Sequence, residues 1–162
     1  FFGLAIGGSL GSSKDQMKNI VNYTSLQLHK SNKYKPIHLL GIGDQIDIWN
    51  FVKCGIDTFD CVSPTRIARH GTALAHNNEG KINIKNSIYR EDINKLDERC
   101  NCTTCNSYTR SYLHHLFKID EILGLQLLTI HNIFYMNQMM KFIREAINND
   151  CLDEAQKKWF ID

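Results

Sequence analysis

The sequence predicts an α/β fold with parallel strands, followed by a helical region that carries a metal site. Between residues 37 and 62, two short apolar runs typical of buried strands flank a stretch with helical periodicity. After residue 107 the apolar positions recur at helical spacing, directly behind three crowded cysteines. At 162 residues the chain has the length of one domain.

The first predicted helix follows the Gly7-Gly8 turn. Ser12 or Ser13 can accept a hydrogen bond from the first turn and so cap this helix. A polar loop over residues 30–35 ends it. The apolar positions that recur at helical spacing are Met17, Ile20, Val21 and Leu28.

A strand, a helix and a second strand follow in that order. The run Ile37–Leu40 reads as a buried strand that ends at the turn Gly41–Gly43, and Asp44 or Asp47 can cap the next helix. That helix stops at Gly55, and the second strand-like run covers Ile56–Val62. Strand, helix, strand predicts a parallel βαβ unit, so the loops 41–47 and 60–69 should lie on one face and carry the chemistry.

The remaining elements are a hairpin and two helical stretches. Residues 72–75 and 81–84 read as two strands joined by a turn at Asn77–Gly80, an insertion on the parallel core. Farther on, a helix carries Tyr112 to Ile119, a break is expected at Gly124, and a second helix covers Ile130–Ile147.

The strongest local signal is the cysteine cluster. Cys100, Cys102 and Cys105 lie within six residues, and three such thiolates can converge on one tetrahedral Zn²⁺. The fourth ligand must come from elsewhere, and the candidates are His114, His115 and His131. No open position with a carboxylate base is evident nearby, so the pattern favours a closed, structural zinc site.

Composition excludes some broad classes. A formal net charge of +2 provides no global positive field, so any contact with RNA requires a local patch. The apolar stretch Phe1–Ile6 is too short for a signal peptide or a membrane span, and we expect no membrane partner. A piece of a longer cytosolic, hence cytoplasmic, protein is the interpretation that fits best.

Two aspartates lie in the second strand-like run. Asp57 and Asp60 are three residues apart, so on a strand they point to opposite faces. Asp60 is nearer the carboxyl end, where barrel enzymes place catalytic groups, whereas Asp57 is expected to pair with a neighbouring cation. Taken alone, surface and capping roles are commoner for such residues.

Two arginines follow in the next loop. The spacing of Arg66 and Arg69 lets two guanidinium groups reach along one phosphodiester backbone or onto base edges. From the residues alone, a solvated surface pair is equally compatible with this pattern.

Several separated motifs, in order, resemble the tRNA-guanine transglycosylase family. They cover nearly the whole chain. The motifs are Ile6-Gly7-Gly8, Leu40-Gly41-Ile42-Gly43, the run from Phe59 through Asp60-Cys61-Val62 and Pro64-Thr65-Arg66 to Ala68-Arg69, the cluster Cys100, Cys102 and Cys105, Tyr112-Leu113-His114-His115-Leu116, and Ile130-His131-Asn132.

The resemblance implies the carboxyl-terminal part of a (β/α)₈ TIM barrel with a zinc subdomain and C-terminal helices. Residues 1–99 would supply later strands and helices of the barrel with the hairpin insertion, 100–150 the helical zinc-binding subdomain, and 151–162 a C-terminal tail. The earlier strands, and the pocket aspartate that acts on the base, would belong to the part of the family's fold that is not in this chain.

Carried over by residue, the resemblance assigns roles to specific positions. Asp60 matches the catalytic nucleophile, and Gly8 lies in the segment whose backbone binds the substrate base. Cys100, Cys102, Cys105 and His131 match the ligands of one structural Zn²⁺ per chain. The positions that match RNA contacts are Gly41, Ile42, Gly43, Asp44, Gln45, Ile46 and Asp47, and, in the wobble-base recognition segment, Thr65, Arg66, Ile67, Ala68 and Arg69.

The implied activity is exchange of guanine in a tRNA anticodon loop for a deazaguanine, by double displacement through a covalent aspartyl intermediate, with no nucleotide cofactor. The full-length enzyme is expected to be a homodimer or heterodimer, and this chain alone inactive. The stretch Ser9–Ser13 departs from the family's bacterial pattern, which leaves the incoming base open between queuine and its aminomethyl precursor. The alternatives are a non-catalytic paralogue and a zinc-stabilised RNA-binding subunit.

Overall fold

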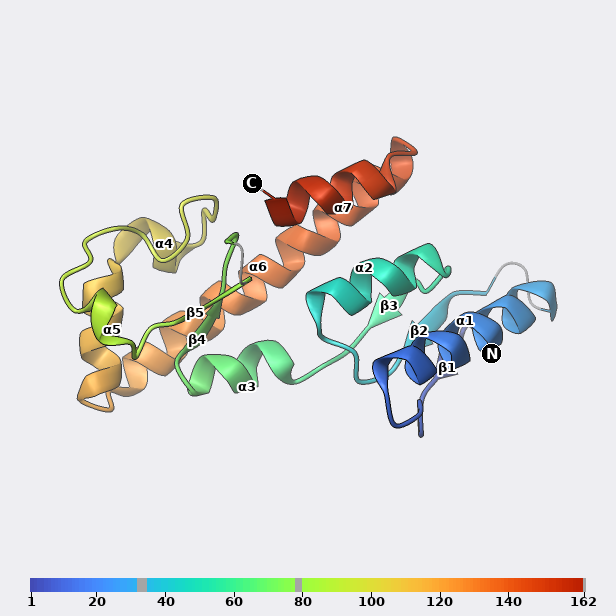
Figure 1. Cartoon of the computed structure of the whole chain (residues 1–162), viewed down its shortest axis with the longest axis horizontal. Coiled ribbons are helices and arrows are strands. Elements are labelled where there is room, and N and C mark those ends of the chain that lie inside the picture. The colour runs from blue at the N-terminus through green and yellow to red at the C-terminus, as the bar shows by residue number, and fades with distance from the viewer. Residues whose placement is uncertain (32–34, 78–79, 162) are drawn as a thin grey trace. The chain divides into compact units, whose positions relative to one another are not determined.

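The computed structural model describes residues 1–31, 35–77 and 80–161 as a mixed α/β structure (Figure 1). The chain divides into two compact units, Phe1–Ser63 and Pro64–Asp162. Each unit has its own apolar core. Among the helices of the described residues, none has both the length and the apolar character needed to cross a bilayer.

The first unit contains a parallel three-stranded sheet. Its strands are β1 (Leu4–Ile6), β2 (Ile37–Leu39) and β3 (Thr58–Phe59), in the order β1-β2-β3. Helix α1 (Lys14–Ser31) connects β1 to β2, and α2 (Gln45–Lys53) connects β2 to β3. The predicted parallel βαβ unit is therefore confirmed, and β1 with α1 adds another of the same kind.

The third strand is shorter than the predicted run Ile56–Val62. Its backbone pairing begins where the N–H of Asp57 donates to the carbonyl of Ile37 at 2.9 Å. After Phe59 the chain leaves the sheet, and the N–H of Ser63 already donates to the Cys61 sulfur at 3.3 Å, in the turn that starts the next helix. The apolar run extended beyond the strand because it also includes this turn.

Side-chain caps fix where the first two helices begin. The Ser13 hydroxyl accepts the N–H of Gln16 at 3.2 Å, so Ser13 rather than Ser12 caps α1. Asp44 rather than Asp47 caps α2, accepting the N–H of Asp47 at 3.2 Å. Helix α1 runs into the predicted polar loop as far as Ser31, and residues 32–34 of that loop lie outside the described residues.

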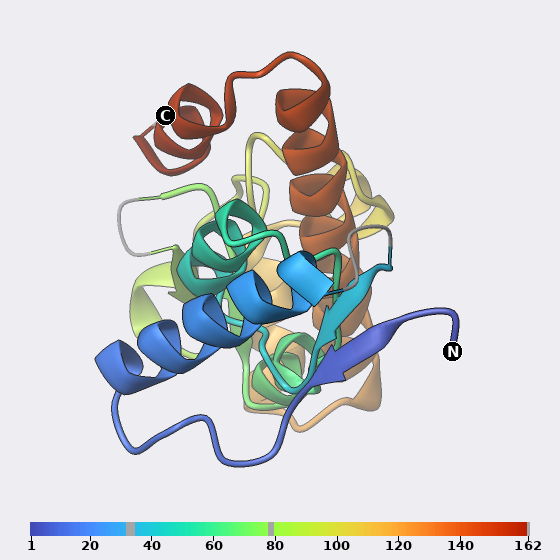
Figure 2. The same cartoon turned by 90° about the vertical axis from the view of Figure 1, so that its right-hand side faces the viewer.

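The core of the first unit lies between the sheet and its helices. Figure 2 shows α1 beside β1 and β2, and the buried Val21 of α1 packs against strand residues there. Phe51 comes from α2. The buried apolar residues of this core are Ile6, Val21, Ile37, Leu39, Phe51 and Ile56.

The second unit begins with a helix where a loop was expected. Residues 63–69 form α3 (Ser63–Arg69), so the prediction of a loop from 60 to 69 was wrong beyond residue 62. Pro64 lies in the first turn, where its missing N–H costs no helical hydrogen bond. The tight packing of Ala68, which is fully buried, holds this helix on the core of the unit.

The predicted hairpin is confirmed. Strands β4 (Thr72–Leu74) and β5 (Lys81–Asn83) are antiparallel, with Ala73 opposite Ile82. Its predicted turn, Asn77–Gly80, includes residues 78 and 79, which lie outside the described residues. A 3₁₀ turn, η1 (Ser87–Tyr89), and a short helix, α4 (Thr103–Ser107), follow.

Three helices complete the second unit: α5 (Arg110–Lys118), α6 (Ile122–Asn148) and α7 (Leu152–Ile161). The expected break at Gly124 was wrong, because the chain turns at Asp120, whose φ is 54°, and Gly124 lies inside α6. A Cβ atom at Gly124 would lie 3.1 Å from the Cβ of Leu116, so this glycine allows α5 and α6 to pack closely. Helix α7 occupies most of the segment expected as a tail.

Candidate functional site

Asp60 is the first residue after β3, at the carboxyl edge of the parallel sheet. Gly7 follows β1 and Leu40 follows β2 at this same edge, since the three strands are parallel. The Oδ1 atom of Asp60 accepts the N–H of Gly41 at 3.1 Å and contacts Nε2 of His38, also at 3.1 Å. Strand β2 and the turn after it therefore hold the carboxylate that follows β3 at the sheet edge.

This environment favours the ionised form of Asp60. The N–H of Gly41, and then the hydrogen bond from His38, lower the pKa of Asp60 below its ordinary value of 3.8. Gly41 has a φ of +76°, a conformation that glycine adopts without steric cost. The Asp60 side chain is 59% exposed, so the carboxylate is both charged and accessible to a reactant.

His38 was not among the residues that the sequence singled out. It lies opposite Thr58 in the register of β2 and β3, and its Nδ1 lies 2.8 Å from the Thr58 hydroxyl. Asp60 is two residues beyond Thr58, on the same face. The sequence predicts the two strands but not their register, and only the register with His38 opposite Thr58 brings His38 close to Asp60.

Asp57 has a different partner from the one expected. Its Oδ2 accepts the backbone N–H of Ile37 at 2.7 Å, at the start of β2. The described residues include no ion pair of Asp57, so the expected pairing with a cation is not seen among them.

The segment 41–47 turns from the sheet edge into α2. Gly43 packs tightly against the loop that follows β3, since a Cβ atom at Gly43 would lie 2.6 Å from the Cβ of Cys61. Gln45 and Asp47 are buried, and Asp47 pairs with Nζ of Lys14 at 3.0 Å. Gly41, Asp44 and Ile46 are the exposed residues of the segment, and Gly8, after β1, is exposed with a φ of +87°.

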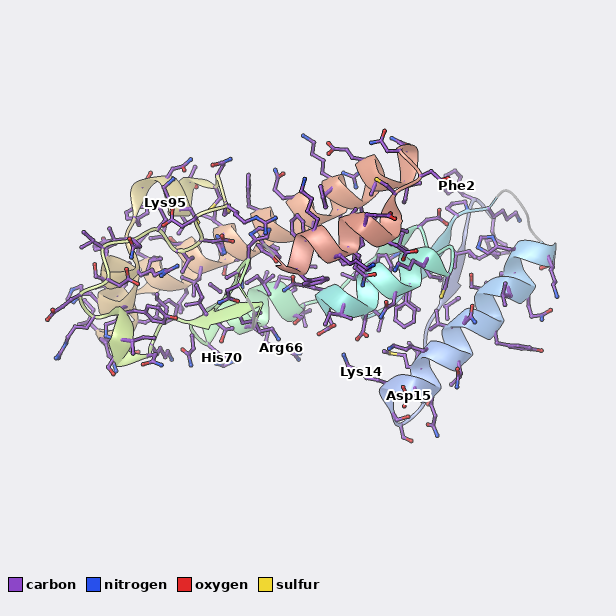
Figure 3. The ribbon with its side chains drawn as sticks, turned by 45° about the horizontal axis from the view of Figure 1, so that its top comes forward. Phe2, Lys14, Asp15, Arg66, His70 and Lys95 are labelled. Atoms are coloured by element: carbon purple, nitrogen blue, oxygen red, sulfur yellow. The ribbon has the colours of Figure 1, made fainter. Side chains whose placement is uncertain are left out.

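The residues 65–69 present two cations on one helix. Arg66 and Arg69 are exposed on α3, one turn apart, while Ala68 faces the core and Thr65 and Ile67 are half-buried. Figure 3 shows Arg66 and His70 on the same side of α3. The helix thus keeps both guanidinium groups within reach of one ligand.

The metal ligands that the sequence suggested come together in the second unit. The sulfurs of Cys100, Cys102 and Cys105 and a ring nitrogen of His131 all lie within 4.8 Å of one another, and all four residues are buried. Nδ1 of His131 lies 3.5 Å from the Cys102 sulfur and 3.3 Å from that of Cys105. Ligands of a tetrahedral Zn²⁺ with bonds of about 2.1 and 2.3 Å lie about 3.6 Å apart, so the group fits a structural zinc ion.

Polar contacts around the cluster prepare its ligands. Nε2 of His131 lies 2.7 Å from the Leu74 carbonyl, which can only accept, so this nitrogen carries the proton and Nδ1 is left for the metal. Sharing of protons with Cys100 and Cys105 lowers the pKa of the Cys102 thiol, which favours its thiolate form. Of the other candidates, His114 contacts the Ile84 carbonyl at 2.8 Å, and His115 is exposed.

Two further buried polar residues support this centre: Asp97, which the sequence analysis did not single out, and Asn132, which it named in a motif without a role. The Asp97 carboxylate accepts a hydrogen bond from Nδ1 of His76 at 2.7 Å, and the backbone carbonyl of Asp97 accepts the N–H of Cys100. Burial, the largest single influence, raises the pKa of Asp97, but the contacts with His76 and the N–H of Arg99 together outweigh burial and keep the pKa below the ordinary value. Asn132, next to His131, accepts the N–H of Leu74 at 2.8 Å.

Comparison with known proteins places the chain in a family. A model of the family described as queuine tRNA-ribosyltransferase matches residues 1–162. The chain belongs to this family. The name fits the tRNA-guanine transglycosylase resemblance that the motifs indicated, since both describe the same class of tRNA-modifying transferase.

Curated queuine tRNA-ribosyltransferases from several bacteria are similar to the chain. The protein of Roseiflexus sp. (strain RS-1) is 44% identical over 161 residues, covering 98% of this chain and 40% of that protein. The protein of Thermoanaerobacter sp. (strain X514) is 45% identical over 161 residues, covering 99% and 42%. That of Fusobacterium nucleatum subsp. nucleatum is 41% identical over 160 residues, covering 98% and 42%. The chain spans about two fifths of the length of these relatives.

Proposed function

We propose that the protein to which this chain belongs exchanges guanine at the anticodon wobble position of tRNA for queuine or a 7-deazaguanine precursor, with Asp60 as the nucleophile. The observation that carries this proposal is the state of Asp60. Its carboxylate is exposed at the carboxyl edge of the sheet and is held ionised by Gly41 and His38. Relatives over 40% identical are named queuine tRNA-ribosyltransferases.

The proposed reaction is a double displacement at one sugar carbon. A carboxylate oxygen of Asp60 attacks C1′ of the ribose, the glycosidic bond to guanine breaks, and guanine leaves with its bonding electron pair and takes up a proton. The incoming base then attacks C1′ from the vacated side, releases Asp60, and gives up its ring proton. Two inversions give net retention, as in retaining glycosidases, and no nucleotide cofactor is consumed.

The arrangement of β1, β2 and β3 supports the barrel interpretation. Three parallel strands joined through helices, with a carboxylate after the third, match the way (β/α)₈ barrels carry their active sites. We propose that these strands are the later strands of such a barrel. Gly8, exposed after β1 at the same edge as Asp60, suits a backbone contact with the base.

Two exposed segments suit contact with RNA. In the segment 41–47, Gly41 and Ile46 are exposed, and Asp47 is held inward by Lys14, which fixes the course of the chain. In the segment 65–69, Arg66 and Arg69 can donate to phosphates or base edges while a target base is splayed out. The chain's small net charge makes such a local patch necessary.

We propose that zinc is bound by Cys100, Cys102, Cys105 and His131 and has a structural role, with no part in the reaction. All four residues are buried, and a closed set of four protein ligands leaves no position for substrate. Within this unit the ion would join Cys100, Cys102 and Cys105, which lie in and just before α4, to His131 of α6, 26 residues beyond Cys105.

A non-catalytic paralogue, or a zinc-stabilised subunit that only binds RNA, is the alternative. Neither would need a carboxylate with two donors directed at one of its oxygens. This feature favours the enzyme.

Two substitutions in the full-length protein test the proposal. Asp60→Asn removes the negative charge and should abolish exchange of labelled guanine into tRNA, while tRNA binding stays close to wild type. Asp57→Asn, the matched control, should keep most of the activity, because the Asp57 side chain accepts the N–H of Ile37 at the start of β2 and has no recorded contact with Asp60. Ordinary turnover by Asp60→Asn would refute the proposal.

A second measurement identifies the nucleophile directly. Wild-type protein mixed with tRNA and no competing base should form a covalent adduct that survives denaturation, and digestion should map it to the peptide with Asp60. An adduct on another residue would refute the assignment even if exchange activity is present.

A further inference from the structure

Among residues 1–31 and 35–63, the described part of the first unit, His38 is the one side chain in hydrogen-bond contact with the Asp60 carboxylate. It comes from β2, the strand beside β3, and its Nε2 lies 3.1 Å from Oδ1 of Asp60. The imidazole is partly exposed, with 31% of its side chain accessible. His38 therefore lies at the surface where a substrate would meet Asp60, and not in the core.

The contacts of His38 fix which of its nitrogens carries the proton. An ionised carboxylate only accepts hydrogen bonds, so Nε2 must donate to Asp60. Nδ1 lies 2.8 Å from the hydroxyl of Thr58, which can donate to a neutral ring or accept from a charged one. The Thr58 hydroxyl can therefore hydrogen-bond to Nδ1 in both protonation states of the ring, and in both Nε2 donates to Asp60.

The two donors to Asp60 converge on the same atom. Gly41 donates from the backbone and His38 from its ring, both to Oδ1 at 3.1 Å. A carboxylate held at one oxygen has a fixed plane and presents its other oxygen, Oδ2, to a reactant. Such alignment matters because a nucleophile must approach the sugar carbon opposite the leaving base.

We propose that His38 is a positioning residue that, backed by Thr58, holds Oδ1 of Asp60 so that Oδ2 attacks C1′ of the ribose. This inference rests on the proposed function, because it assumes that Asp60 is the nucleophile. His38 itself gains and loses no proton in the step. Its contribution is to orientation, and removing it should slow the chemical step while leaving tRNA binding unchanged.

Two amide variants separate the two contacts of the ring. The amide nitrogen of glutamine reaches about as far as Nε2 of histidine, so His38→Gln can still donate to Asp60. The shorter asparagine reaches about as far as Nδ1, so His38→Asn can contact Thr58 but not Asp60. The Gln and Asn variants carry the same amide group and differ only in the length of the side chain. His38→Phe keeps an aromatic ring without any hydrogen-bond donor.

The experiment measures adduct formation in a single turnover of the full-length protein, with Asp60→Asn as a separate arm. We expect His38→Phe and His38→Asn to slow adduct formation about tenfold or more, with KM for tRNA within about twofold, and His38→Gln to restore most of the rate. Wild-type adduct rates in His38→Phe, equal losses in the Gln and Asn variants, or an effect on KM alone would each overturn the role of His38. Turnover by Asp60→Asn would instead overturn the proposed function.

The amide variants keep the test meaningful if His38→Phe does not fold. Both are polar and smaller than the aromatic variant, and their zinc content and thermal unfolding should equal those of the wild type. A difference in adduct rate between two equally folded proteins then reports on the contact with Asp60 alone. Equal rates in the two would reject the proposal.

Discussion

The Nε2 atom of His131 lies 2.7 Å from the carbonyl oxygen of Leu74, 57 residues away in sequence. This contact joins α6 to β4 and turns Nδ1 of the same ring toward the cysteine sulfurs. A metal ligand and a packing contact between two elements are thus provided by one buried side chain. Binding of zinc and folding of this unit should be coupled for that reason.

The first prediction concerns the metal. Purified full-length protein should hold about one zinc ion per chain, measured by elemental analysis, and Cys102→Ser should lose it and unfold at a lower temperature, because metal affinity here is folding free energy. Chelation of the wild type should lower the unfolding temperature in the same way. Folded protein without zinc would exclude the structural role.

His114 supplies the matched control for the fourth ligand. Both histidines are buried and each contacts a backbone carbonyl, but only His131 lies with the sulfurs. His131→Ala should therefore release zinc to a chelator much faster than His114→Ala. The opposite ranking would show that the ligand set is wrong.

The second prediction concerns Asn132, which is fully buried and joins three backbone groups. It accepts the N–H of Leu74 and donates to the carbonyls of Thr72 and Pro64. Asn132→Leu leaves these groups unsatisfied, so it should lower the free energy of unfolding by about 3 kcal/mol or more, measured by denaturant titration. Asn137→Leu, an exposed change on the same helix, should alter it by less than about 0.5 kcal/mol. Equal effects would show that the contacts of Asn132 contribute little.

Local signals in the sequence were enough to predict the βαβ unit, the hairpin and the helices α1, α2, α5 and α6, but not the helices α3, α4 and α7. The spacing of Met17, Val21 and Leu28 indicated α1, and the two apolar runs around α2 indicated the βαβ unit. Where two residues had the same capping chemistry, as with Asp44 and Asp47, the sequence could not choose. The Asp47 carboxylate accepts a hydrogen bond from Nζ of Lys14, 33 residues away, and that contact depends on the tertiary fold.

The wrong or undecided predictions also depend on contacts between residues that are distant in sequence. Glycine ends helices and also permits close helix packing, and at Gly124 the second role applies, because Leu116 of α5 lies against it. The three candidate histidines could not be separated by spacing, since the carbonyl that orients His131 comes from Leu74. His38 escaped notice because its relation to Asp60 exists only in the register of β2 with β3.

The third prediction concerns RNA binding by α3. Arg66→Ala and Arg69→Ala in the full-length protein should each weaken tRNA binding and reduce its salt dependence, since each removes an exposed cation able to contact phosphate. The slope of log affinity against log salt should fall by about one for each lost contact. Arg144→Ala removes an equally exposed cation from α6 and serves as the control for charge. Equal effects of all three changes would assign the result to general charge and not to α3.

The last prediction concerns the donor that does most to keep Asp60 ionised. The N–H of Gly41 is the largest influence that lowers the pKa of Asp60 below 3.8, and its direction depends on a φ of +76°. Any residue with a Cβ is strained there by about 1–2 kcal/mol, so Gly41→Ala should shift the backbone and weaken the hydrogen bond. The pKa of Asp60 should then rise toward its ordinary value.

A higher pKa means that Asp60 takes up a proton at higher pH, where it no longer attacks. A limb set by Asp60 lies at or below its ordinary pKa of 3.8, so the adduct-formation rate of full-length protein is followed from about pH 6 down to about pH 3, and the limb should move upward in pH in Gly41→Ala. Gly11→Ala imposes at least as much strain, because its φ is +92° and a Cβ atom there would also lie 2.7 Å from the Cβ of Gln16, and it should leave the limb in place because Gly11 has no recorded hydrogen bond to Asp60. If the two variants show the same profile as the wild type, the Gly41 N–H does not control the charge of Asp60. If both profiles move together, strain and not the hydrogen bond is responsible, since of these two glycines only Gly41 donates to the carboxylate.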